Sequence, residues 1–86
     1  MTNSNYYVDR DVLKNVCGIH EITNLFRRFL LAKIKSNLKP TNSKGKYYPV
    51  LQFNYDEVIE FLSKHQAKYN HIIIFLKGYY ESMDTN

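Results

Sequence analysis

The stretch that decides the fold is HEITNLFRRFLLAKIKSN, residues 20–37, in which apolar side chains recur every three or four positions. These apolar residues are Ile22, Leu25, Phe26, Phe29, Leu30 and Ile34. The spacing predicts an amphipathic helix from His20 to Asn37 that buries one face. The opposite face is mainly polar and basic and carries His20, Thr23, Asn24, Arg27, Arg28, Leu31 and Lys35.

A short helix is expected before this one. Asp9 is a suitable N-cap for a helix that runs to about Val16. Its inward face would be Val12, Leu13 and Val16, which have helical spacing. Gly18 then suits a tight turn because glycine adopts the left-handed conformation freely. Cys17, beside this glycine, is expected to pack inward.

A β-hairpin is expected after the long helix. Pro40 prevents the helix from continuing, and residues 41–46 have the composition of a turn. Residues from Tyr47 to Phe53 are good strand formers, so they predict the second strand of the hairpin. Pro49 cannot donate a backbone hydrogen bond, which favours an edge strand or a strand with an unpaired N–H.

The next helix has a clear beginning. Asn54 is a good N-cap, and Glu57 stands three residues later, as in a capping box. Phe53 and Val58 occupy the two positions of a hydrophobic staple. The apolar spacing predicts that this helix continues to about Tyr69.

The last segment, residues 71–83, fits two structures. Residues 72–75 look like a buried strand, whereas the spacing of the apolar residues up to Met83 fits a helix. We favour the helix, because a lone strand would need a partner. This segment either completes the core or forms a surface for a dimer or another partner. The residues of that surface would be Ile72, Phe75, Leu76, Tyr79 and Tyr80.

Length and composition exclude several classes of protein. A chain of 86 residues makes one domain with a modest core. Cys17 is the only cysteine, so an intrachain disulfide and a cysteine-rich zinc module are excluded. The three histidines, His20, His65 and His71, do not have metal-ligand spacing, and we expect no cofactor. We find no signal peptide and no apolar run that could span a bilayer, so we expect a cytoplasmic protein.

Positive charge is concentrated in one part of the chain. The formal net charge is +4, but residues 20–50 contain seven lysines and arginines and one acid, Glu21, which gives +6. The remaining residues contain five basic and seven acidic side chains. A contiguous basic segment of this kind is typical of a surface that faces phosphates.

The order of elements resembles the winged helix-turn-helix of the excisionase and MerR-like family. The resemblance covers about Tyr7 to His65, and the stretch YYPVLQFNYDEVIEFL, residues 47–62, is similar to the family's strand followed by a capped acidic helix. It implies a mainly α fold with a small β-hairpin, one domain, and an extra C-terminal helix. The expected parts are a flexible tail (1–6), the winged helix (7–69) and a C-terminal helix or interaction segment (70–86).

The resemblance implies that the second helix enters the major groove of double-stranded DNA. The base-reading candidates are His20, Thr23, Asn24, Arg27 and Arg28. Arginine can pair with guanine, asparagine with adenine, and threonine can hydrogen-bond or touch a thymine methyl group. The candidates for contacts to the DNA backbone are Lys33, Lys35, Lys39, Asn42, Ser43, Lys44 and Lys46. Single-stranded DNA is an alternative ligand, because Tyr47 and Tyr48 could stack on bases.

The function expected is that of a non-enzymatic DNA-binding protein. It would be an excisionase-like architectural factor or a small transcriptional regulator of a phage or mobile element, and its richness in Asn, Ile, Lys and Tyr is typical of AT-rich genomes. The sequence contains no catalytic motif, and helix capping already explains the acidic pair Asp56 and Glu57. The alternative is an adaptor subunit that holds a recombinase or replication enzyme on DNA. A homodimer is the other expected partnership.

Overall fold

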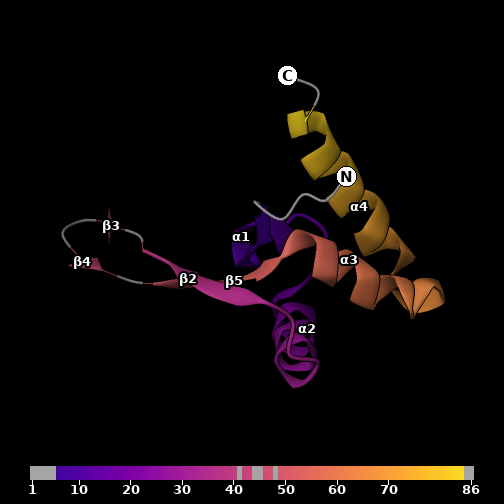
Figure 1. Ribbon diagram of the computed structural model, residues 1–86, viewed down its shortest axis with the longest axis horizontal. Coiled ribbons are helices and arrows are strands. Elements are labelled where there is room, and N and C mark those ends of the chain that lie inside the picture. The colour runs from indigo at the N-terminus through magenta and orange to yellow at the C-terminus, as the bar shows by residue number, and fades with distance from the viewer. Residues whose placement is uncertain (1–5, 41, 44–45, 48, 85–86) are drawn as a thin grey trace.

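Four helices pack around a small antiparallel sheet in the computed structural model, which describes residues 6–40, 42–43, 46–47 and 49–84 (Figure 1). The elements, in chain order, are β1 (Tyr7–Val8), α1 (Arg10–Leu13), α2 (Ile19–Leu31), β2 (Ser36–Lys39), β3 (Asn42–Ser43), β4 (Lys46–Tyr47), β5 (Val50–Asn54), α3 (Tyr55–Ser63) and α4 (Gln66–Asp84). The prediction of helices with a small hairpin and a C-terminal helix is confirmed.

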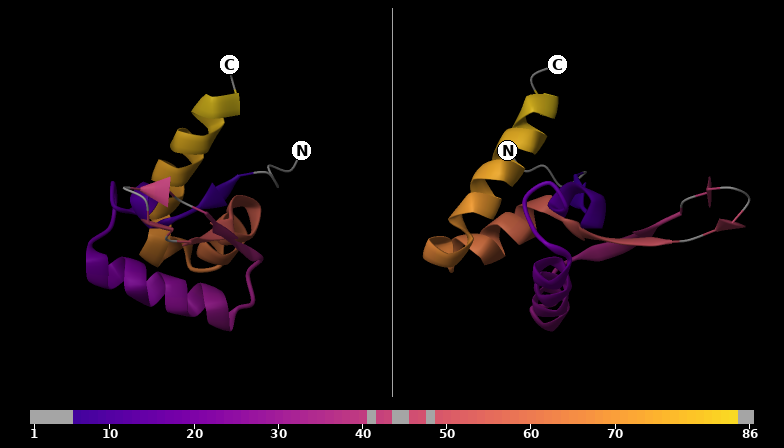
Figure 2. Two further views of the ribbon diagram at one scale, coloured as in Figure 1. Left: turned by 90° about the vertical axis from the view of Figure 1, so that its left-hand side faces the viewer. Right: turned by 180° about the vertical axis from the view of Figure 1, so that it is seen from behind.

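The strand β5 lies at the centre of a three-stranded sheet with the order β1-β5-β2. β2 pairs with it from Ser36 opposite Phe53 to Lys39 opposite Val50. β3 follows β2 and pairs with β4, which precedes β5. The four strands therefore form a long hairpin that projects from the rest of the protein (Figure 2). The predicted edge position is therefore wrong for β5, because β1 pairs along its other side. Pro49 lies between β4 and β5, outside both strands, so the predicted continuous strand from Tyr47 to Phe53 is wrong.

The helix α2 ends at Leu31, and the prediction that it continues to Asn37 is wrong. Lys33 has a φ of 58°, in the left-handed region that reverses the chain. The Ile34 N–H then donates to the Phe29 carbonyl at 3.1 Å, which closes the last turn. Pairing with β5 takes residues 36–39 into a strand, and this tertiary interaction overrides their local spacing.

Aromatic side chains join α2 to the sheet. Phe53 of β5 has no exposed surface, and its ring lies 5.0 Å from that of Phe26 and 5.1 Å from that of Phe29. Both pairs have the edge-to-face geometry that aromatic rings favour. Ile22 and Leu25 of α2 are buried beside them. The predicted buried face of α2 is therefore confirmed, apart from Leu30, which is 55% exposed.

The segment before α2 differs in detail from its prediction. Asp9 caps α1 as expected, accepting a hydrogen bond from the Val12 N–H at 3.1 Å. The α-helix ends at Leu13, earlier than the predicted Val16. Gly18 has a φ of −79° and a ψ of 168°, so the expected left-handed conformation is wrong. It serves instead as the extended N-cap residue of α2, and its carbonyl accepts from the Ile22 N–H at 3.0 Å.

Two helices replace the single helix expected after Asn54. The Asn54 side chain accepts from the Glu57 N–H at 3.1 Å, which confirms the predicted N-cap. α3 ends at Ser63, however, whereas the prediction continued it to Tyr69. The N–H groups of Lys64 and His65 donate three residues back, and the chain then turns into α4. His65 is exposed in this turn, and its ring lies 5.8 Å from that of Phe61 and 6.3 Å from that of Tyr69.

The helix α4 contributes to the core. Ile72 and Leu76 have no exposed surface and Tyr80 is 3% exposed, so the prediction that these three belong to a partner surface is wrong. The Tyr80 hydroxyl donates to the Tyr7 carbonyl at 2.7 Å. Only Phe75, half-buried, and Tyr79, 36% exposed, remain available from that predicted surface.

The N-terminal tail is shorter than expected. Tyr6 packs against the core, and its ring lies 5.4 Å from that of Tyr80. The predicted flexibility of residues 1–6 is therefore wrong for Tyr6, and the other five residues lie outside the described part of the chain. No helix in the described ranges has both the length and the apolar character that a membrane span requires.

Candidate nucleic-acid interface

A line of exposed side chains follows the outward face of α2. His20, Asn24, Arg27 and Leu31 are spaced four, three and four residues apart, and all four are exposed. This spacing places them on one side of a helix, opposite the buried Ile22, Leu25 and Phe29. Three of the five predicted base-reading residues therefore lie together on the outward line. Leu31, the most exposed of the large apolar residues at 78%, extends the line at its C-terminal end.

Thr23 lies beside this line and already has hydrogen-bond partners. Its hydroxyl donates to the Ile19 carbonyl at 3.1 Å and accepts from Arg10 of α1 at 3.4 Å. The Arg10 guanidinium also lies over the Phe26 ring, 5.5 Å from its centroid. Arg10 thus adds a positive charge to one flank of α2. No pattern in the sequence indicates a role for this residue, because its position depends on how α1 packs against α2.

Arg28 lies on the other flank of α2, toward α4. It lines a notch together with Asn24 of the same helix and Lys68 of α4. The only acid of the basic segment, Glu21, is on this flank too, and its carboxylate lies 3.8 Å from His71 Nε2. The outward line itself therefore contains no carboxylate.

The predicted backbone-contacting residues lie along the turn and the hairpin. Lys33 is exposed in the turn after α2, Lys35 is exposed before β2, and Lys39 is exposed at the end of β2. Asn42 and Ser43 form β3 and Lys46 begins β4, farther out on the hairpin. Lys44 lies outside the described residues. Figure 1 shows the hairpin on one side of α2 and the beginning of α4 on the other.

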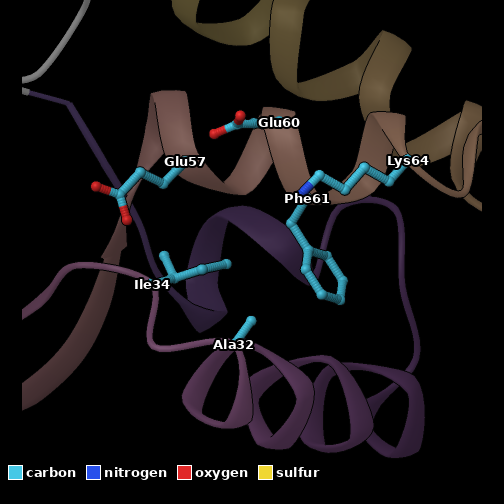
Figure 3. Close-up of a pocket in the computed structure, with 6 residues that line it drawn as sticks. All are labelled: Ala32, Ile34, Glu57, Glu60, Phe61 and Lys64. Atoms are coloured by element: carbon cyan, nitrogen blue, oxygen red, sulfur yellow. The ribbon is translucent and has the colours of Figure 1, made fainter.

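Acidic side chains occupy a separate place, between α3 and the end of α2. A hollow of about 200 Å³ lies there, with Ala32, Ile34 and Phe61 as its apolar part (Figure 3). Glu57 and Glu60 line it from α3, together with Lys64. The Glu57 carboxylate accepts from the Lys35 N–H at 2.7 Å, so it anchors the chain between α2 and β2. Two carboxylates make this hollow unsuitable for phosphate.

Cys17 is a poor candidate for a nucleophile, and the histidines form no metal-ligand cluster within the described residues. Burial and, to a smaller extent, the nearby Glu21 carboxylate together raise the pKa of the Cys17 thiol to about 12. The thiol therefore stays protonated at neutral pH and is a weak nucleophile. No group of three His, Cys, Asp or Glu side chains comes close enough to hold a metal ion, as far as residues 6–40, 42–43, 46–47 and 49–84 are concerned.

Comparisons with protein-family models, curated proteins and solved structures give no match to this chain.

Proposed function

We propose that this protein binds double-stranded DNA as a winged helix-turn-helix, with α2 in the major groove and the β2–β5 hairpin on the backbone. α1 and α2 are the two helices of the motif, joined by a turn that ends at Gly18. α3 and α4 contribute to the core against which these two helices pack. The protein has no chemistry of its own in this proposal, and serves as an excisionase-like architectural factor or a small regulator.

The outward line of α2 carries this proposal. The line contains a guanidinium, an amide and an imidazole, and no carboxylate, on a helix whose other face is fixed in the core. Arg27 and Asn24 are side chains that pair with guanine and adenine in the major groove. A helix placed rigidly in this way can hold those side chains against base edges. The lysines of the turn and hairpin supply the phosphate contacts that determine position.

The opposite distribution of acids supports the same orientation. Asp56, Glu57 and Glu60 all belong to α3, and Glu57 and Glu60 line the hollow between α3 and the end of α2 (Figure 3). The protein is therefore positive where α2 and the hairpin are exposed and negative behind them. Such a separation orients the protein as it approaches a polyanion.

A salt titration of binding tests this proposal. We expect random duplex DNA to bind with a dissociation constant of roughly 10⁻⁴–10⁻⁶ M at physiological salt. The logarithm of the binding constant should fall with the logarithm of salt concentration with a slope of roughly −4 to −6, since each neutralised phosphate contributes about −0.9. The control is a single strand of the same length. Equal or tighter binding of the single strand, or a slope near zero, would refute duplex binding.

An adaptor function has a specific observation in its favour. Ile74 is 62% exposed on α4, and the ring of Tyr79 stacks on that of Phe75 at 5.8 Å. These apolar side chains lie on α4, whose C-terminal end points away from α2 (Figure 1). If the titration shows weak binding of every DNA, this part of α4 is where a protein partner should be sought.

A further inference from the structure

The notch between α2 and α4 brings together two cations from different helices. It has a volume of about 100 Å³. Its walls are made by Arg28 and Asn24 of α2 and Lys68 of α4, and its base contains the buried Leu25 and Tyr69. The sequence does not indicate this arrangement, because Arg28 and Lys68 are forty positions apart.

The two cations have no carboxylate partner among the residues that the structure describes. Both side chains are exposed. Lys68 Nζ lies 5.4 Å from the centroid of the Tyr69 ring, so a buried aromatic ring holds the ammonium group near the notch. One acid, Glu21, also lines the notch, and its carboxylate lies 3.8 Å from His71 Nε2, so the two cations outnumber the single carboxylate. Two positive charges placed side by side in this way favour an anion between them.

The position of the notch indicates which anion it takes. Asn24 belongs both to the notch and to the outward line of α2, so the two surfaces are continuous. The major groove is about 12 Å wide and is bordered by phosphates. A helix lying in the groove therefore brings the residues on its flanks against the backbone, while its outward line meets the bases.

We infer that Arg28 and Lys68 together bind one phosphodiester group of the DNA backbone, at the edge of the groove that α2 enters. This inference rests on the proposed function. The arginine offers a fork of N–H donors and the lysine a compact positive charge, which together suit a phosphate. Arg28 becomes a backbone contact, although the sequence suggested base reading. α4 becomes part of the DNA interface, on the side of α2 opposite the hairpin.

The test compares Lys68→Gln with Lys77→Gln, a matched control on the same helix whose lysine is also exposed. Lys68→Gln should make the salt slope shallower by about 0.9, which corresponds to a loss of affinity of about eightfold at 0.1 M salt. Lys68→Arg should keep most of the affinity because it keeps the charge. Lys77→Gln should behave as wild type. If Lys68→Gln and Lys77→Gln have the same salt slope and the same affinity, the inference is overturned.

A duplex with single methylphosphonate substitutions identifies the contact directly. Neutralising one particular phosphate should weaken binding of the wild-type protein severalfold and weaken that of Lys68→Gln less, because only Arg28 still contacts that phosphate in the variant. A profile that is the same for both proteins would count against the contact. If the wild-type protein binds no duplex, the proposed function fails as well. If it binds duplex DNA and only the Lys68 results disagree, this inference alone fails.

Discussion

Replacing Phe53 by alanine should lower the free energy of unfolding by about 3–5 kcal/mol. The side chain is fully buried in the central strand, and both aromatic rings of α2 pack edge-to-face against it. Its removal leaves a cavity at the junction of α2 with the sheet. Small domains are stable by roughly 5–15 kcal/mol, so this change removes a large part of the total. Urea unfolding followed by circular dichroism measures it.

Phe75→Ala is the control for this variant. Phe75 is half-buried on α4 and packs at the edge of the core, so its truncation should cost clearly less. DNA binding by Phe53→Ala should fall in proportion to the folded fraction, because α2 keeps its position only while it packs against β5. A loss below about 1 kcal/mol for Phe53→Ala, or a larger loss for Phe75→Ala, would contradict the packing of α2 described above.

Arg27→Ala should cost about 1–3 kcal/mol of binding free energy on the preferred duplex and relax the preference at one base pair. Arg27 lies on the outward line of α2, exposed and on the same side of the helix as Asn24. Removing a base contact affects the preferred sequence more than other sequences. The measurement is the ratio of dissociation constants for the preferred and a scrambled duplex at fixed salt.

Lys39→Ala is the matched comparison, because Lys39 is exposed on the hairpin. It should weaken binding to the preferred and the scrambled duplex alike and reduce the salt slope by about 0.9, as expected for a phosphate contact. Similar losses for Arg27→Ala and Lys39→Ala on both duplexes would show that α2 contacts only the backbone.

The local signals in the sequence predicted the beginnings of elements better than their ends. Asp9 and Asn54 act as N-caps as expected, because capping depends on neighbouring residues. The end of α2 depends on the pairing of β2 with β5, and nothing between residues 32 and 37 marks it. Lys33 does not indicate the end of the helix either, because a residue in the left-handed region is usually glycine and not lysine.

The role of α4 is a second feature that the sequence alone could not predict. The spacing correctly predicted a helix, but it could not show whether the apolar face meets the core or a partner. In the structure, α3 ends early, and α4 turns back to bury Ile72 and Leu76. No glycine or proline marks the break at residues 64–65. The break serves tertiary packing, which a local pattern does not encode.

Only part of the candidate site was predicted, because the rest of it depends on tertiary packing. His20, Asn24 and Arg27 follow from helical spacing alone, and the structure places them on one line. The places of Arg10 and Lys68 beside α2, and of Arg28 in the notch, follow only from how α1 and α4 pack against α2. The residues that share one face of a helix can thus be predicted from a single sequence. The residues on the flanks of the site can be identified only from the three-dimensional fold.

The central claim is that α2 reads base edges of duplex DNA, and selection from a pool of randomised duplexes tests it most directly. The wild-type protein should enrich one short sequence over successive rounds, with a strong preference at the base pair that Arg27 contacts. Arg27→Ala should lose the preference at that position and keep the others. If the wild-type protein binds the duplexes but the selected sequences stay random, the result would contradict the claim and leave only binding to the DNA backbone.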